Sequence, residues 1–200
     1  MGLLGGSFNP AHDGHRHISL EALRRLGLDE VWWLVSPQNP LKERAGMAPL
    51  AERLAQARAV ARHPRIRVLA LERELGTRYT ADTLAALRQR FPDIGFVWLM
   101  GADILIELPR WVRWTEILGR VPVAIFARPS YLLKAMAGRA AKRFASHRVD
   151  TSLGRALPDL EPPAWAYFPI RLHPASATAI RAARRARAAG SQEDNSDSQS

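Results

Sequence analysis

The stretch that decides the fold is Gly5–His15, whose sequence is GGSFNPAHDGH. A brief apolar run, Met1–Leu4, precedes it, and the apolar residues of Gly14–Leu26 that follow share one face of a helix. The order is therefore strand, glycine-containing loop and helix. Ligands of open α/β sheets bind beyond the carboxyl ends of the strands, where glycines admit a phosphate to the backbone and a helix N-terminus offers unpaired N–H groups. We expect an anion-binding site here.

Two histidines stand at the start of this helix. His12 and His15 are three positions apart, so both imidazoles can face one anionic ligand. A metal site is the alternative, but a stable one needs three or four ligands. His17, the other histidine nearby, falls on a different helix face from His15. We therefore predict phosphate contacts and no metal held by the protein.

The rest of the chain alternates between apolar runs and helix-like segments. Strands are expected at Met1–Leu4, Val31–Val35, Ile66–Leu71, Phe96–Met100, Val121–Phe126 and Trp165–Ile170. Helices are expected at Gly14–Leu26, Leu50–Arg62, Asp82–Phe91, Leu132–Phe144 and Ala177–Ala189. Turn residues in 147–164 indicate a long excursion before the last strand. This alternation predicts an α/β fold with an open parallel sheet and helices on both faces.

Length and composition indicate one domain. The chain has 200 residues, of which we assign 1–190 to the domain and 191–200, which lack apolar side chains, to a disordered polar tail. It has no cysteine, which excludes disulfides, zinc–thiolate sites and cysteine nucleophiles. The longest apolar stretch, Ile94–Ala102, is far shorter than the ~20 residues of a membrane helix, and no basic leader precedes the first glycines. We expect a soluble cytoplasmic protein without a membrane partner.

The chain is strongly basic, with 29 lysines and arginines against 19 acids and a net charge of +10. Such a charge attracts phosphates, on nucleotides or on nucleic acids. Codon bias in a GC-rich genome is a competing explanation, because nearly all the basic residues are arginines and they are scattered along the chain. We expect a phosphate-bearing small substrate and no nucleic acid. A basic nucleic-acid-binding module is the alternative from another class.

A second motif, SATAIR at Ser176–Arg181, opens the last expected helix. Ser176 and Thr178 are capping residues by default. In a functional interpretation, the same hydroxyls and Arg181, one turn into the helix, hold the phosphates of a nucleotide at the helix N-terminus. The second interpretation makes both ends of the chain contribute to one site.

Together the two motifs resemble the signatures of the nucleotidyltransferase superfamily, (His/Thr)-x-Gly-His and Ile-Ser-x-Thr-x-Ile-Arg. Ala175 stands where that family usually has isoleucine before the serine. The resemblance implies a Rossmann-like nucleotidyltransferase fold and transfer of a nucleoside monophosphate. It also implies that His15 contacts the α-phosphate of the nucleotide, with His12 as its companion.

Three segments in the middle of the chain indicate which family within the superfamily it resembles. Ser36–Lys42, Arg78–Leu84 and Gly101–Trp111 are expected at the carboxyl edge of the sheet. With the two motifs they make residues 2–185 similar to the nicotinate-nucleotide adenylyltransferases, which transfer AMP from ATP to nicotinate mononucleotide and release deamido-NAD and pyrophosphate in NAD biosynthesis. The alternative acceptors are nicotinamide mononucleotide and pantetheine phosphate.

The resemblance also assigns roles to residues. Lys42 would reach the phosphate of the mononucleotide, Trp111 would stack on its pyridine ring, and N–H groups near Thr80 and Val112 would bind the nicotinate carboxylate. Without it, Lys42 is a solvated loop residue and Trp111 an ordinary core residue. The implied catalytic residues are His12, His15 and Arg181. Contacts to ATP, which would carry Mg²⁺, are implied for Gly5, Gly6, Ser7, Phe8, Asn9, His12, His15, Gly101, Asp103, Arg128, Ser176, Thr178 and Arg181.

Two details are left open. Asp103 either accepts hydrogen bonds from a ribose hydroxyl or caps the helix that follows it, and Ile104 stands where the family has asparagine or serine. His12, His15, Lys42 and Arg181 are expected to supply the positive field that neutralises charge on the reacting phosphates. The oligomeric state is not predicted.

Overall fold

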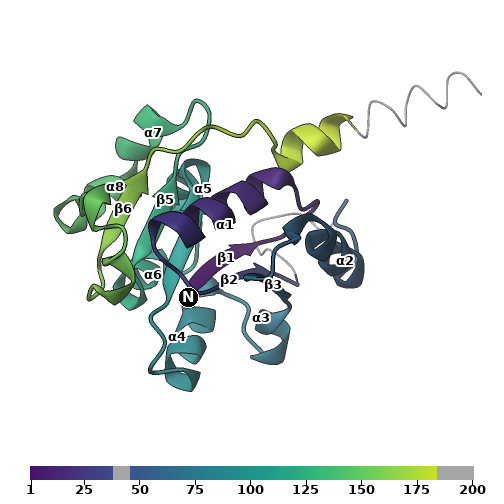
Figure 1. Cartoon of the computed structure of the whole chain (residues 1–200), viewed down its shortest axis with the longest axis horizontal. Coiled ribbons are helices and arrows are strands. Elements are labelled where there is room, and N and C mark those ends of the chain that lie inside the picture. Colours follow the sequence, from purple (N-terminus) through teal and green to yellow (C-terminus); the bar gives the residue numbers. More distant parts are fainter. Residues whose placement is uncertain (38–45, 184–200) are drawn as a thin grey trace, which may run out of the picture.

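The computed structural model describes residues 1–37 and 46–183. At its centre is a sheet of six strands in the order β3-β2-β1-β4-β5-β6, in which every neighbouring pair is parallel (Figure 1). The strands are β1 (Gly2–Gly6), β2 (Val31–Val35), β3 (Ile66–Leu69), β4 (Val97–Gly101), β5 (Val123–Phe126) and β6 (Trp165–Phe168). The predicted Rossmann-like parallel sheet is confirmed, and its strand order reverses between β1 and β4.

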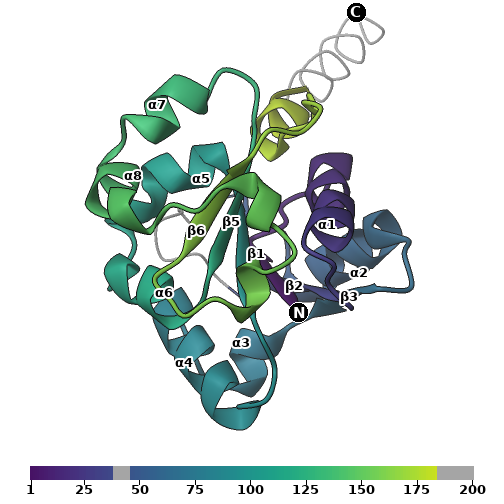
Figure 2. The same cartoon turned by 60° about the vertical axis from the view of Figure 1, so that its left-hand side comes forward.

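Helices cover both faces of this sheet (Figure 2). They are α1 (Asp13–Arg25), α2 (Leu50–Ala61), α3 (Leu71–Glu74), α4 (Thr80–Arg90), α5 (Ala102–Glu107), α6 (Trp114–Arg120), α7 (Leu132–Met136) and α8 (Arg139–Arg143). Single 3₁₀ turns lie at Leu108–Arg110, Ala145–His147, Thr151–Leu153 and Leu157–Asp159, and residues 177–183 form a further helical segment. One hydrophobic cluster takes residues from α1 and α2, and a second takes residues from α4 to α8.

The strands alternate between these two clusters, as the pleat of a β-strand requires. In β1, Leu3 belongs to the second cluster and Leu4 to the first. In β4, Trp98 belongs to the second cluster and Leu99 to the first, and all five residues of the strand are buried. This double burial explains why the strands are continuous apolar runs rather than alternating ones.

The first glycine of the GGSFNPAHDGH stretch has a structural cause. A Cβ on Gly5 would overlap the indole ring of Trp98. The absence of a side chain at Gly5 therefore lets Trp98 cross the end of β1, where the strand order reverses. That reversal opens the crevice in which ligands of such sheets bind.

Some of the expected helices were wrong or incomplete. Leu132–Phe144 is not one helix but two, α7 and α8, because Gly138 has extended dihedral angles (φ −70°, ψ 160°) and begins α8 as its N-cap. The short helices α3, α5 and α6 were not predicted, since a few residues show no helical periodicity. The last predicted helix is observed over 177–183. Its remainder and the expected tail at 191–200 lie outside the described residues.

No helix within residues 1–37 and 46–183 is long and apolar enough to cross a membrane.

Candidate active site

The two histidines form a contact pair at the N-terminus of α1. His12 is the N-cap residue, and its backbone N–H donates to Nδ1 of His15 at 3.2 Å. The two ring centroids are 3.9 Å apart. Because Nδ1 of His15 accepts this hydrogen bond, its ring proton is on Nε2. Below the pair, the hydroxyl of Ser19 donates to the carbonyl of His15 and accepts from the indole N–H of Trp33, which anchors the helix.

Gly14 explains the spacing of the first motif. A Cβ at this position would lie 2.9 Å from the His12 ring and 3.0 Å from the carbonyl oxygen of Ala175. No side chain fits in that gap. The glycine between the two histidines therefore lets the C-terminal motif approach the first one, which local sequence reasoning did not reveal.

His12 is buried, with 5% of its surface exposed, and its pKa is lowered to about 4. Burial is the main cause, and electrostatic repulsion from the neighbouring Arg128 and His173 side chains adds to it. The imidazole is therefore uncharged at neutral pH. The expectation that His12 contributes positive charge is wrong: it contributes hydrogen bonding instead. Its Nδ1 is buried and makes no hydrogen bond to any described residue.

Arg181 joins the two motifs directly. Its Nη1 donates to the backbone carbonyl of Asn9 at 2.7 Å, and its Nη2 donates to the hydroxyl of Thr178 at 3.2 Å. Ser176 accepts from the backbone N–H of Ala179 and so caps the helical segment 177–183. The sequence placed Ser176, Thr178 and Arg181 beside the first motif, and the structure brings them together there.

Arg128 and Asp103 lie close to each other and to Ala175, which precedes the second motif. Nε of Arg128 lies 3.5 Å from Oδ1 of Asp103, and its Nη1 donates to the carbonyl of Ala175 at 3.4 Å. A Cβ on Gly101 would overlap the Asp103 carboxylate in its present position, so a larger residue at the end of β4 would displace that carboxylate. The N-cap of α5 is Gly101, and no side chain caps this helix. Asp103 therefore faces the arginine rather than capping α5.

Phe8 and Asn9 support the loop between β1 and α1. The Phe8 ring is buried and stacks on Trp33, with 5.0 Å between ring centroids. The side chain of Asn9 bonds Gly46 and Ala48, at 3.0 and 3.3 Å. Only backbone atoms of Phe8 are therefore left to meet a ligand.

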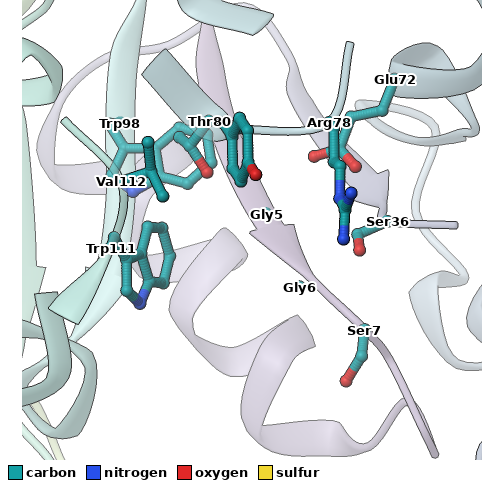
Figure 3. A pocket seen from close by; sticks show the side chains of 11 residues that line it. Gly5, Gly6, Ser7, Ser36, Glu72, Arg78, Thr80, Trp98, Trp111 and Val112 are labelled. Atoms are coloured by element: carbon teal, nitrogen blue, oxygen red, sulfur yellow. The ribbon is translucent and has the colours of Figure 1, made fainter. Parts of the chain in front are cut away.

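A pocket opens beside this loop, on the face of the sheet covered by α3 and α4 (Figure 3). The space between its walls is about 630 Å³, including the part open to solvent. It is lined by Gly5, Gly6, Ser7, Ser36, Glu72, Arg78, Tyr79, Thr80, Trp98, Trp111 and Val112. Three of the four residues predicted to bind the acceptor, Thr80, Trp111 and Val112, therefore line one pocket. The fourth, Lys42, lies outside the described residues.

One end of the pocket is aromatic. Trp98 and Trp111 lie at this end with Val112 and Thr80 (Figure 3). Thr80 is the first residue of α4, and neither its backbone N–H nor that of Val112 donates to an acceptor within the described part of the chain. The indole N–H of Trp98 is also without a partner there. This end combines flat apolar surfaces with the unused backbone donors of Thr80 and Val112.

The other end is polar. Glu72 and Arg78 lie across from the tryptophans, next to Ser36, with Gly5 and Gly6 between the two ends (Figure 3). Only 8% of the Glu72 surface is exposed, and burial raises the pKa of its carboxyl group to about 7. Sequence reasoning missed Glu72, because a single acid between a strand and a helix carries no pattern.

Arg53 holds the polar end in place. This arginine of α2 is 1% exposed and donates to four backbone carbonyls, those of Ser7, Ser36, Pro37 and Ala48, at 2.7 to 2.9 Å. No carboxylate pairs with it among the described residues, and burial lowers its pKa. Arg53 therefore ties the ends of the loops after β1 and β2 together. Nothing in the sequence pattern distinguishes it from the other arginines.

The sequence of the chain is similar to those of known proteins. Residues 3–183 match the cytidylyltransferase-like family. The chain is 56% identical over 181 residues to a probable nicotinate-nucleotide adenylyltransferase of Parvibaculum lavamentivorans, covering 90% of each chain. It is 53% identical over 182 residues to a protein of the same description from Cereibacter sphaeroides, covering 91% of this chain and 96% of the relative.

The fold is also found among solved structures. The nicotinic acid mononucleotide adenylyltransferase of Plasmodium falciparum, complexed with NaAD, superposes with a TM-score of 0.60 at 16% identity, covering 88% of this chain and 75% of that one. At this identity the likeness concerns the fold alone.

Proposed function

The chain belongs to the cytidylyltransferase-like family and, within it, to the nicotinate-nucleotide adenylyltransferases of NAD biosynthesis. From this premise we propose that its pocket holds nicotinate mononucleotide, and that the histidine pair and Arg181 hold ATP. The acceptor phosphate then attacks the α-phosphorus of ATP. Deamido-NAD forms and pyrophosphate leaves.

The acceptor fits the aromatic end of the pocket. The pyridine ring stacks on Trp111, because a flat aromatic face suits a flat heterocycle. The nicotinate carboxylate takes the unused backbone N–H groups of Thr80 and Val112. An amide at that position would turn its NH₂ group toward a donor, which costs ~1–3 kcal/mol per unpaired group. The acid form is therefore preferred. Lys42 remains the proposed partner of the acceptor phosphate.

ATP occupies the other side of the β1–α1 loop. The phosphates lie against the N-terminus of α1, the hydroxyls of Ser176 and Thr178, and the Arg181 guanidinium. Support comes from the hydrogen bond between Arg181 and the Asn9 carbonyl, which brings the second motif to the first. The nucleotide is approached by the backbone of Gly5 to Asn9 and of Gly101. Arg128 adds positive charge, and Asp103 accepts a hydrogen bond from a ribose hydroxyl of ATP.

The reaction needs no protein nucleophile, because the attacking phosphate oxygen is already anionic. The protein must align two polyanions and stabilise charge on the α-phosphoryl and leaving oxygens. Nε2–H of His15 donates to the α-phosphoryl group, and neutral His12 adds a hydrogen bond without charge. Positive charge comes from Arg181 and Arg128.

A magnesium ion is proposed to arrive with ATP. Within residues 1–37 and 46–183 no three histidine, aspartate or glutamate side chains are grouped as a metal site. Mg²⁺ commonly keeps several waters and binds through substrate phosphates with few protein ligands, and this donor set suits that mode. The ion would shield the negative charge of the phosphates.

The observation that carries the proposal is that Thr80 and Val112, whose backbone N–H groups donate to no described acceptor, line one pocket with two tryptophans. It is tested by measuring pyrophosphate release from ATP with nicotinate mononucleotide, nicotinamide mononucleotide, pantetheine phosphate or no acceptor. We expect release with the pyridine mononucleotides and strongest with the acid. Release with pantetheine phosphate alone would overturn the proposal, and so would salt-sensitive nucleic-acid binding without any release.

A further inference from the structure

The pocket wall contains a carboxyl group that the proposed reaction does not use. Glu72 follows β3, lies in α3 and faces the polar end of the pocket (Figure 3). More than nine-tenths of its surface is buried, yet its side chain makes no hydrogen bond or ion pair with any described residue. Its backbone carbonyl accepts from the N–H of Thr77, so the main chain of this turn is fixed.

An unpaired buried carboxyl is costly, and a protein keeps one mainly where a ligand pairs with it. The titratable neighbours at this end of the pocket are Arg78 and Tyr79. The guanidinium of Arg78 lies over the Tyr79 ring, 5.7 Å from its centroid, and forms no ion pair with Glu72. Burial alone therefore raises the pKa of Glu72. A ligand that brings hydrogen-bond donors would relieve this cost.

The chemistry of the mononucleotide limits which of its groups can meet Glu72. Its carboxylate and phosphate are anionic acceptors, which a glutamate repels, and its pyridinium nitrogen carries no proton. Only the 2′- and 3′-hydroxyls of the ribose donate hydrogen bonds. A carboxylate has two oxygens and can accept from both hydroxyls of such a diol.

The layout of the pocket agrees with this choice. Trp98 and Trp111 mark the ring end, Glu72 lies across from them, and Gly5 and Gly6 form the floor between (Figure 3). A ribose attached to a ring at the aromatic end would cross this glycine floor toward Glu72. We propose that Glu72 is a specificity-determining residue that accepts hydrogen bonds from the ribose hydroxyls of the acceptor mononucleotide, an inference that rests on the proposed function.

The experiment combines variants with substrate analogues. The values of kcat/KM are measured for nicotinate mononucleotide and its 2′,3′-dideoxy analogue in the wild type, Glu72→Gln and Glu72→Leu. Glu74→Gln is the matched control, because Glu74 ends the same short helix but is exposed. Hydrogen bonds to a charged group are strong, so the wild type should lose about 10- to 100-fold with the dideoxy analogue. That penalty should fall to about threefold or less in Glu72→Leu and persist in Glu74→Gln.

A second readout does not depend on turnover. Accepting hydrogen bonds from hydroxyl groups favours the ionised carboxylate, so binding of the mononucleotide at pH 7 should release a proton from Glu72. Calorimetric titration in buffers of different ionisation enthalpy measures this release. It should be smaller in Glu72→Gln than in the wild type, and unchanged in Glu74→Gln. If neither Glu72 variant folds, the affinities of the wild-type protein for the two ligands are compared. Binding of the dideoxy analogue as tightly as nicotinate mononucleotide overturns the inference.

Each failure has its own signature. If the wild type does not adenylylate nicotinate mononucleotide, the proposed function fails. If it does, but the dideoxy penalty is unchanged in both Glu72 variants, only the role of Glu72 fails. Glu72 could instead accept from the NH₂ group of an amide acceptor. The variants would then lose activity with the amide form while keeping the dideoxy penalty, which also overturns the inference.

Discussion

The two sides of the site are built in opposite ways. On the proposed ATP side, the backbone N–H of His12 donates to His15, Arg181 donates to Asn9, and Arg128 lies beside Asp103, although Nδ1 of His12 has no hydrogen-bond partner among the described residues. On the proposed acceptor side, the side chain of Glu72 and the backbone N–H groups of Thr80 and Val112 have no hydrogen-bond partner within residues 1–37 and 46–183. The first arrangement stabilises charge in a fixed geometry. The second leaves donors and an acceptor whose pattern selects one ligand, which suits the part of the site that must choose a substrate.

The largest effect is expected on the ATP side, from His15→Ala. Removing a preorganised donor to a reacting phosphate costs ~3–4 kcal/mol, so kcat should fall by about two to three orders of magnitude. The melting temperature should change little. His17→Ala is the matched control, because His17 is on the same helix and bonds the carbonyl of Arg171. Near-normal kcat in folded His15→Ala would remove the histidine from the mechanism.

Arg53→Met tests how much the hydrogen bonds from Arg53 to the loops after β1 and β2 stabilise the protein. This change leaves four backbone carbonyls without their donor, and unsatisfied buried groups cost ~1–3 kcal/mol each. Relaxation recovers part of this, so we expect a loss of about 3 kcal/mol or more in the free energy of unfolding. Denaturant titration measures it, and Arg58→Met, at an exposed position of the same helix, serves as the control. Equal stability of the two variants would show that the Arg53 clamp is unimportant.

Trp111→Ala probes the acceptor side alone. Loss of a stacked aromatic contact is expected to raise KM about tenfold for both the acid and the amide mononucleotide. The ratio of their kcat/KM values should stay the same, because stacking does not distinguish carboxylate from amide. A change in KM for ATP as large as that for the mononucleotide would place Trp111 elsewhere in the site.

The last expected effect is on stability as a function of pH and leaves activity aside. The pKa of Glu72 is raised to about 7 in the folded protein from 4.5, so between these values the folded state holds a proton that the unfolded state has lost. Stability from this group is complete below about pH 4.5 and is lost as the pH rises to about 7. Glu72→Gln should therefore be more stable than the wild type by on the order of 2 kcal/mol at pH 8, but not at pH 4.5. Melting curves at both pH values, with Glu74→Gln beside them, check the sign.

More of the loop between β1 and α1 than of the pocket could be predicted from the pattern of residues, for a physical reason. The strand, loop and start of α1 are continuous in the chain, so GGSFNPAHDGH contains both the local structure and its chemistry. The pocket draws on β1, the residue after β2, α3, α4, β4 and the loop that holds Trp111. Thr80, Trp111 and Val112 came from the family resemblance, whereas Glu72 and Trp98 become visible only when packing brings these segments together.

Even on the ATP side, burial changed the prediction. A histidine at a helix N-terminus was expected to carry charge, but His12 is enclosed and close to Arg128, which lowers its pKa to about 4. The spacing of residues shows which groups meet. Desolvation and neighbouring charges, which decide the protonation state, depend on the folded environment.

The most direct test of the account is the ratio of kcat/KM for nicotinate mononucleotide to kcat/KM for nicotinamide mononucleotide in the wild-type protein. Two backbone donors satisfy a carboxylate but leave a mismatch with an amide, so the account predicts a ratio of about ten to a hundred. A ratio near one, measured with both substrates saturable and ATP in excess, would contradict the assignment of the Thr80 and Val112 N–H groups to the acceptor.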